Sequence, residues 1–290
     1  MSKLSYLAKS ALRNFNPAFD KCPSCGARDY SVEARKFLVT TLRRCSSCGL
    51  LYRYPIEDVE GARRFYEAEY TQGFTTDIPD DETLKHLLDT GFSGTTRDYS
   101  HYIDILSTVT PPPAKVFEFG CSWGYGSWQI AKAGFEVGAY EISQFRGGFA
   151  RDRLNVDLHR DFPSEENKGR FDAVFTSHVL EHVPSVGDAF AGLETYVRPG
   201  GHIVAITPNG SREWRDTDFE SWNTCWGEVH PNFLDVEYYR RKFADRPYFL
   251  STTPVPLDAL ADWAAGKGEQ QVVRALDFVE FCLVLRVGGS

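Results

Sequence analysis

The sequence predicts an α/β fold in which a doubly wound, mainly parallel sheet follows a small four-cysteine ribbon. From Lys115 onward, short apolar runs alternate with helical stretches, which is the pattern of strands joined by crossover helices. The first of these runs ends in a glycine-rich turn at residues 120–126. Two Cys-x-x-Cys-Gly motifs, beginning at Cys22 and Cys45, precede the alternation. These observations predict a ligand-binding sheet with a metal-bound N-terminal appendage.

The composition indicates a globular enzyme with a small-molecule substrate. The chain has 290 residues, of which 42% are hydrophobic, and a formal net charge of −8. Phosphate backbones are bound by clustered Lys and Arg, so this acidic balance argues against a nucleic-acid partner. No apolar run approaches the roughly 20 residues that span a bilayer, and residues 1–15 lack the features of a secretion signal. We therefore expect a cytoplasmic protein without a membrane span, and its oligomeric state stays open.

The chain divides into three predicted segments. Residues 1–55 hold an amphipathic N-terminal helix and the cysteine ribbon. Residues 56–113 are mostly helical and rich in aromatic side chains, as expected of a linker or lid. Residues 114–290 form the sheet domain, which begins after the proline run at 111–113.

The four N-terminal cysteines have the spacing of a structural zinc site. The motifs Cys22-Pro-Ser-Cys25-Gly and Cys45-Ser-Ser-Cys48-Gly are separated by 19 residues, which lies within the range for four-thiolate sites. A closed four-cysteine site leaves no position for water or substrate, so its role is structural. Redox dithiols are the main alternative, but two such turns on a short hairpin, with strands at 29–39 and 40–44, do not suggest that fold.

The alternation after residue 114 gives seven predicted strands. They cover 116–119, a run ending at 141, and then 156–158, 171–176, 202–207, 248–251 and 278–287. Helices are predicted at about 128–133, 145–153, 185–196, 235–244 and 257–264. The last two strands are joined by a hairpin-like excursion that contains the final helix.

The segment KVFEFGCSWGYGSWQIAKAGFEVGAYEIS resembles the first half of class I S-adenosylmethionine (SAM) methyltransferases. Glu118, Gly120 and Gly124 fit the family's acidic-x-Gly-x-Gly-x-Gly signature, with Ser122 in place of the middle glycine. Serine is small enough for close approach of a ligand, although it needs ordinary backbone angles or a strained turn. The resemblance implies a seven-stranded Rossmann-like methyltransferase sheet, with the ribbon and a helical lid added to it.

The resemblance also implies which residues bind SAM. Glu118 and the turn from Gly120 through Ser122 to Gly124 would hold the methionine portion. Glu141 would accept hydrogen bonds from the ribose hydroxyls, a role that suits a carboxylate. The remaining cofactor positions follow the third and fourth strands and comprise Asp161 and Phe162 at the adenine, and Ser177 beside the cofactor. By analogy with related enzymes, Tyr66 and Tyr70 would close over this site.

Three histidines are candidates for the reaction centre. His178 and His182 follow the fourth strand in FDAVFTSHVLEHVPS, a second segment that resembles the family. His230 lies where sugar-modifying methyltransferases with a four-cysteine zinc site carry an active-site histidine. In the C-methylating members a glutamate precedes this histidine, whereas here Val229 does. The valine at this position favours O-methylation, in which a neutral imidazole with a pKa of ~6.5 removes a hydroxyl proton. Structural histidines bonded to the backbone are the alternative.

The loop between residues 207 and 233 is predicted to form the acceptor wall. It places Trp214, Trp222 and Trp226 among several carboxylates, and aromatic faces beside hydrogen-bonding groups suit a sugar. The same residues would also suit plain packing of a long loop.

These features predict a SAM-dependent methyltransferase that carries structural zinc and methylates a small polar acceptor. A sugar hydroxyl on a nucleotide-linked or glycan precursor is favoured. The alternatives are a sugar C-methyltransferase, an RNA base methyltransferase whose ribbon binds nucleic acid, and a non-catalytic zinc-ribbon binding module. The acidic charge of −8 counts against the RNA enzyme.

Overall fold

The computed structural model describes residues 10–13, 20–56, 77–227, 229–266, 269–273 and 278–288. Residues 10–13 are helical, and the rest of the predicted N-terminal helix lies outside the described residues. The predicted lid residues Tyr66 and Tyr70 also lie outside them. Two helices of the predicted linker are described, α3 (Asp81–Thr90) and α4 (Ser100–Val109).

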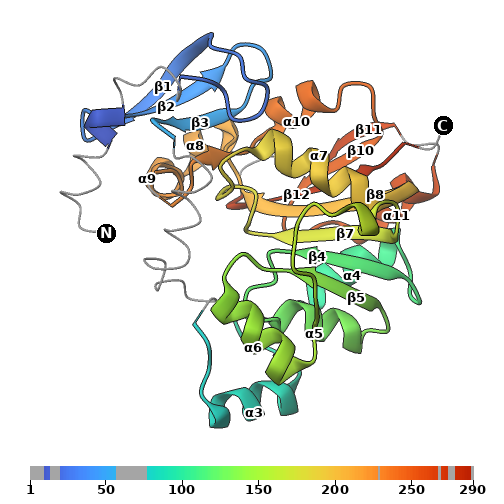
Figure 1. Cartoon of the computed structure of the whole chain (residues 1–290). Coiled ribbons are helices and arrows are strands. Elements are labelled where there is room, and N and C mark those ends of the chain that lie inside the picture. The colour runs from blue at the N-terminus through green and yellow to red at the C-terminus, as the bar shows by residue number, and fades with distance from the viewer. Residues whose placement is uncertain are drawn as a thin grey trace.

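The main sheet has the strand order β11-β10-β12-β8-β7-β4-β5-β6 (Figure 1). Its strands are β4 (Lys115–Phe119), β5 (Glu136–Tyr140), β6 (Asp157–Leu158), β7 (Phe171–Ser177), β8 (Val197–Pro208), β10 (Tyr248–Thr252), β11 (Gln270–Val273) and β12 (Glu280–Arg286). Neighbouring strands are parallel except where β12 lies antiparallel between β8 and β10. The predicted doubly wound, mainly parallel sheet is therefore confirmed.

The count of seven strands differs from the described sheet, which has eight. The additional strand is β11, which pairs in parallel with β10 at the edge. It has only four residues, and none of them is fully buried. A four-residue edge strand that begins with two glutamines lacks the longer apolar run by which buried strands are recognised, and so β11 was not predicted.

Helices cover both faces of this sheet and form two apolar cores (Figure 1). The helices that follow the strands are α5 (Tyr125–Lys132), α6 (Gln144–Leu154), α7 (Val186–Tyr196), α10 (Val236–Lys242) and α11 (Leu257–Ala265), and the segment after β6 holds the short helix η3 (Glu165–Asn167). Ser143, Ser185 and Asp235 each cap a helix by accepting a backbone N–H of its first turn. Helices α7 and α10 pack on one face, while α4, α5 and α11 pack on the other.

The N-terminal ribbon forms a second sheet with the order β1-β2-β3-β9. Its first three strands are β1 (Tyr30–Lys36), β2 (Thr40–Cys45) and β3 (Leu51–Tyr54). The fourth, β9 (Asn232–Phe233), comes from the region after β8 and pairs antiparallel with β3. The ribbon is thus joined to the larger part of the chain by backbone hydrogen bonds.

The three tryptophans of the predicted acceptor wall lie in a hydrophobic cluster instead. Trp214, Trp222 and Trp226 are 3%, 2% and 1% exposed and pack with Leu42 and Leu51 of the ribbon. Two short helices, α8 (Arg212–Thr217) and α9 (Phe219–Thr224), carry or flank them. The prediction that they face a substrate is wrong, because these large apolar rings cover the face of the ribbon sheet.

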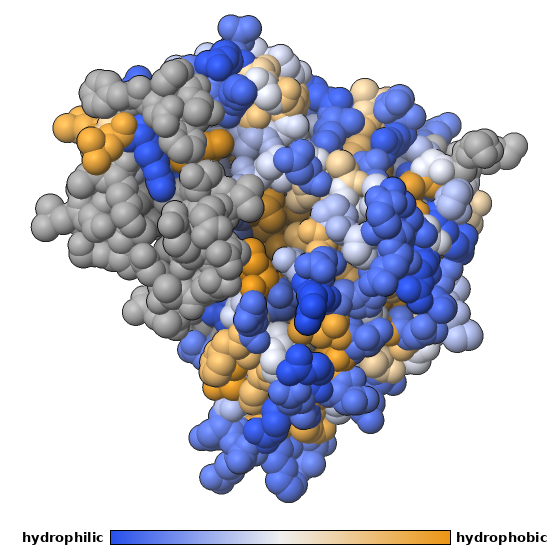
Figure 2. Space-filling view, in the orientation of Figure 1, coloured by the Kyte–Doolittle hydropathy of each residue, from blue (hydrophilic) through white to orange (hydrophobic). Residues whose placement is uncertain are grey.

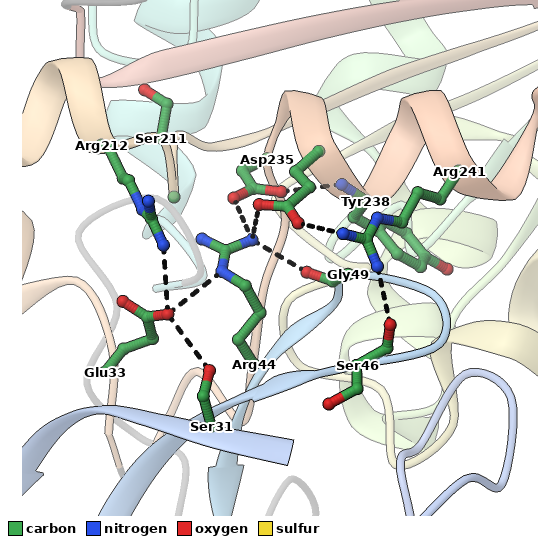
Figure 3. Close-up of polar contacts among 12 residues, drawn as sticks. Ser31, Glu33, Arg44, Ser46, Gly49, Ser211, Arg212, Asp235, Tyr238 and Arg241 are labelled. Atoms are coloured by element: carbon green, nitrogen blue, oxygen red, sulfur yellow. Dashed lines mark hydrogen bonds and ion pairs between the residues drawn. The ribbon is translucent and has the colours of Figure 1, made fainter. Parts of the chain in front are cut away.

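A buried arginine holds the ribbon against α10 (Figure 3). Arg44 of β2 is 6% exposed, and its guanidinium lies 2.9 Å from Asp235 and 3.0 Å from Glu237. It also donates to the carbonyl of Gly49 at 3.0 Å. Asp235 is 2% exposed and caps α10 by accepting the N–H of Tyr238 at 2.9 Å. Burial raises the pKa of Asp235 to about 6 even though Arg44 lowers it.

Loss of Arg44 should weaken the fold more than loss of a neighbouring exposed arginine. Arg44→Met removes the partner of the buried Asp235 carboxylate and should lower the free energy of unfolding by about 3–5 kcal/mol. Arg241→Met is the matched control, because Arg241 pairs with Glu237 in an exposed position and should cost less than about 1 kcal/mol. Urea unfolding followed by circular dichroism measures both. Equal stability of the two variants would contradict the role given to Arg44.

Candidate active site

A pocket of about 540 Å³ lies at the carboxyl ends of β4, β5 and β7. Figure 2 shows a hollow near the middle of the molecule's visible face, with apolar residues in its depth. The strand order reverses at β4, where β5 lies to one side and β7 to the other. Ligands of open α/β sheets bind at this reversal. The topology therefore places the pocket where a cofactor is expected.

The glycine turn after β4 forms one wall of the pocket. Gly120 and Gly124 have φ angles of 83° and 90°, which L-residues with a Cβ rarely adopt. A Cβ on Gly120 would lie 2.4 Å from Val179, and one on Gly124 would lie 2.7 Å from Ala150. Ser122 also has a positive φ, 51°, so the residue that replaces the family's middle glycine holds the left-handed conformation of a strained turn.

Glu141 lies in the pocket directly after β5. Its two carboxylate oxygens accept the backbone N–H groups of Ser122 at 2.9 Å and Ser143 at 2.8 Å. These bonds fix the carboxylate against the glycine turn. Burial raises the pKa of Glu141, while the two N–H bonds work in the opposite direction. Each oxygen keeps one lone pair for a further donor.

Three of the predicted cofactor residues, Glu118, Gly124 and Asp161, do not line the pocket. Glu118 is 2% exposed and is bonded by the hydroxyl of Ser127 beneath the glycine turn, and burial raises its pKa to about 7. Glu118 therefore packs beneath the glycine turn and does not face the pocket. Asp161 is exposed and absent from the pocket walls, because its position after the two-residue strand β6 points it to solvent. By contrast, Phe162 lines the pocket and packs on Phe119, with ring centroids 4.5 Å apart.

His178 and Ser177 line the pocket at the end of β7. Nε2 of His178 lies 2.8 Å from Glu280, and Nδ1 lies 3.4 Å from Glu181. Burial would lower the pKa of His178, but the proximity of these two carboxylates outweighs burial and raises the pKa. His178 also has a φ of 54°, so the chain turns sharply at this residue.

His182 and His230 meet beside a buried glutamate. Their ring centroids are 4.6 Å apart, and Nε2 of His182 lies 3.8 Å from Oε1 of Glu181. His182 lines the pocket, while His230 lies behind it and is absent from the pocket walls. Burial lowers the pKa of His182 to about 4, so its ring is neutral at pH 7. One donor atom from each of Glu181, His182 and His230 can be chosen so that all three lie within 4.8 Å of one another.

Sequence reasoning missed several residues that line the pocket or lie beside it. Glu280 begins β12 and accepts the hydroxyls of Tyr102 at 3.2 Å and Thr253 at 3.0 Å. Tyr99 and Tyr102, from the start of α4, line the pocket with it. Their spacing in the sequence is that of one buried helix face, which by itself does not indicate a ligand site. Glu181 stands within the quoted histidine motif, and its position next to His182 was the available signal.

The four cysteines converge as their spacing predicts. The Sγ atoms of Cys22 and Cys48 are 3.5 Å apart, as are those of Cys25 and Cys45, and all four lie within 4.8 Å of one another. Tetrahedral coordination with Zn–S bonds of about 2.3 Å requires S···S distances of about 3.8 Å. The donor set and its spacing therefore fit a tetrahedral metal ion.

Comparison with known proteins identifies the family. Residues 92–247 match the family described as "Methyltransferase domain", which is more than half of the chain, and the chain belongs to this family. It is similar to the ubiquinone biosynthesis O-methyltransferases of Aromatoleum aromaticum and Alkalilimnicola ehrlichii, with 34% and 31% identity over 103 residues. Each match covers 33% of this chain and 44% or 42% of the relative. The chain thus spans less than half the length of these relatives.

A solved structure supports the same fold. The plantazolicin methyltransferase BpumL, in complex with a pentazolic desmethylPZN analog and SAH, superposes with a TM-score of 0.50 at 12% identity, covering 80% of this chain and 97% of that one. At this identity the likeness concerns the fold alone. Family membership therefore identifies a methyltransferase domain in this chain. Within the described ranges, no helix combines the length and apolarity needed to cross a bilayer.

Proposed function

We propose that this protein transfers the methyl group of SAM to a hydroxyl oxygen of a small polar acceptor, with a sugar as the favoured class. The observation that carries the proposal is the meeting, in one pocket, of Glu141 and the glycine turn with His178 and His182. The first pair suits the cofactor, and the second suits a hydroxyl group. The printed names of the relatives, which are O-methyltransferases, support oxygen as the methylated atom.

Some residues of the pocket would bind the cofactor, and others would lie where the cofactor and the acceptor meet. Bound SAM supplies an activated methyl group, so the protein must mainly align it with the acceptor. Glu141 would hold the ribose, with its oxygens already oriented by Ser122 and Ser143. Phe162, whose ring centroid lies 5.7 Å from that of Tyr140, would cover the adenine. Ser177 and His178 stand at the end of β7, where the cofactor and the acceptor would meet.

A sugar acceptor is supported by the pocket rather than by the tryptophan loop. The acceptor side presents the rings of Tyr99 and Tyr102 beside the carboxylate of Glu280. Aromatic faces stack on the C–H faces of a sugar, while carboxylates and imidazoles accept or donate hydrogen bonds to its hydroxyls. His182 and His230 would act on the hydroxyl that receives the methyl group.

The cysteine cluster should hold about one structural zinc ion per chain. Cys22→Ser should lose most of this zinc and unfold the ribbon, whereas Ser46→Ala, an exposed change within the second motif, should keep it. Elemental analysis of the purified, reduced protein measures the zinc content. Absence of zinc from the wild type, or equal zinc in both variants, would contradict the assignment.

Glu141→Ala should weaken the binding of both SAM and its demethylated product by about 1.5–3 kcal/mol, the range for hydrogen bonds to a charged group. Glu136→Ala is the matched control, because Glu136 starts the same strand and its side chain is 71% exposed. Isothermal titration calorimetry measures both affinities. If Glu141→Ala binds as tightly as Glu136→Ala, the ribose contact lies elsewhere.

His182→Ala and His230→Ala should each lower turnover by roughly 10²- to 10⁴-fold while SAM affinity persists. The reason is that both rings would act on the acceptor hydroxyl and not on the cofactor. His86→Ala, an exposed histidine on α3, is the control. Transfer of labelled methyl from SAM to a panel of hydroxylated acceptors gives the rate. Near-normal turnover in both variants would remove the histidines from the reaction.

A further inference from the structure

We propose that Glu181, His182 and His230 bind a divalent cation at the part of the pocket wall that His182 lines. The three residues come from two separate segments, the loop after β7 and the turn before β9, yet one donor atom of each can lie within 4.8 Å of the others. Two imidazoles and one carboxylate are a common donor set for divalent transition metals, and they leave coordination positions open.

Both imidazoles are oriented as metal ligands usually are. Nδ1 of His182 lies 2.8 Å from the carbonyl oxygen of Val229, and Nδ1 of His230 lies 2.5 Å from that of Cys225. A carbonyl oxygen only accepts, so each Nδ1 carries the proton and each Nε2 carries the lone pair. Metal-binding histidines typically donate their second ring N–H in this way, which fixes the tautomer and the ring.

The buried carboxylate of Glu181 gives an independent reason for a cation. Glu181 is 1% exposed, and neither of its oxygens makes a hydrogen bond within the described part of the chain. His178 at 3.4 Å and His182 at 3.8 Å are its nearest cationic or potentially cationic partners among the described residues. A buried carboxylate without hydrogen bonds is costly unless it is paired or bound to metal.

The chemistry of this site rests on the proposed function. His182 is the ligand that lines the pocket. An acceptor hydroxyl that reached an open coordination position of the cation beside this ring would have its pKa lowered, as bound metals lower that of water. The hydroxyl proton would leave to water. The oxygen lone pair would then form the new O–C bond as the C–S bond of SAM breaks, which yields the methylated acceptor and S-adenosylhomocysteine. Under this proposal the two histidines act as ligands rather than as a free general base.

Binding of Mn²⁺ to the full-length protein tests the site without an acceptor. Titration in the presence of S-adenosylhomocysteine, with free Mn²⁺ followed by electron paramagnetic resonance, should reveal one site per chain that His86→Ala retains. Glu181→Gln and His230→Ala should each weaken this binding at least ~10-fold. S-adenosylhomocysteine affinity, measured on the same samples, should stay unchanged and shows that each variant is folded. Two separate ligand variants keep the test valid if one of them fails to fold.

Two results of the Mn²⁺ titration would overturn the cation site. One is the absence of Mn²⁺ binding to the wild type at millimolar concentration. The other is binding that Glu181→Gln and His230→Ala leave unchanged. Methyl transfer that continues in the presence of a chelator, with the cysteine zinc retained, would reject the cation while leaving the proposed function intact. Failure of the wild type to bind SAM would instead reject the proposed function, so the two failures are distinguishable.

Discussion

The geometry of the candidate site depends on the hydrogen bonds of one buried asparagine, Asn232. Its backbone N–H donates to the carbonyl of Glu181 at 3.1 Å, and its side-chain amide donates to the carbonyls of Leu180 and Val183. Asn232 is fully buried and belongs to β9, which pairs with β3 of the ribbon. The loop that carries Glu181 and His182 is therefore held by a strand of the ribbon sheet, since a buried backbone needs such partners.

The cysteine ribbon touches the pocket wall at a second place. The carbonyl of Pro23, between the first two cysteines, accepts the hydroxyl of Ser185 at 3.0 Å and the N–H of Gly187 at 3.3 Å. Gly187 has no space for a side chain, because a Cβ would lie 2.1 Å from the carbonyl oxygen of Ser24. Ser185 itself lines the pocket. A metal ion that stiffens this cysteine turn would stiffen the pocket wall with it, although no cysteine faces the pocket.

The parts of the site that could be predicted from sequence are those built by local segments. Strand, turn, helix and strand follow one another between residues 115 and 143, so the positions of Gly120 and Glu141 relative to each other are set within one short stretch. Both line the pocket, as the motif implies. The convergence of the four cysteines could also be predicted, because the spacing of the two motifs alone restricts the geometry of a metal site.

The side of the pocket formed by Tyr102 and Glu280 could not be predicted, because it is assembled from residues far apart in the sequence. Tyr102 and Glu280 are hydrogen-bonded across 178 positions, and this contact depends on β12 lying antiparallel beside β8. His230 meets His182 only through the pairing of β9 with β3. The tryptophans of the long loop were misassigned for the same reason: their partner, the ribbon sheet, lies about 170 positions earlier. Sequence likeness in the cofactor segment therefore carries little information about the acceptor, whose recognition depends on contacts between distant segments of this chain.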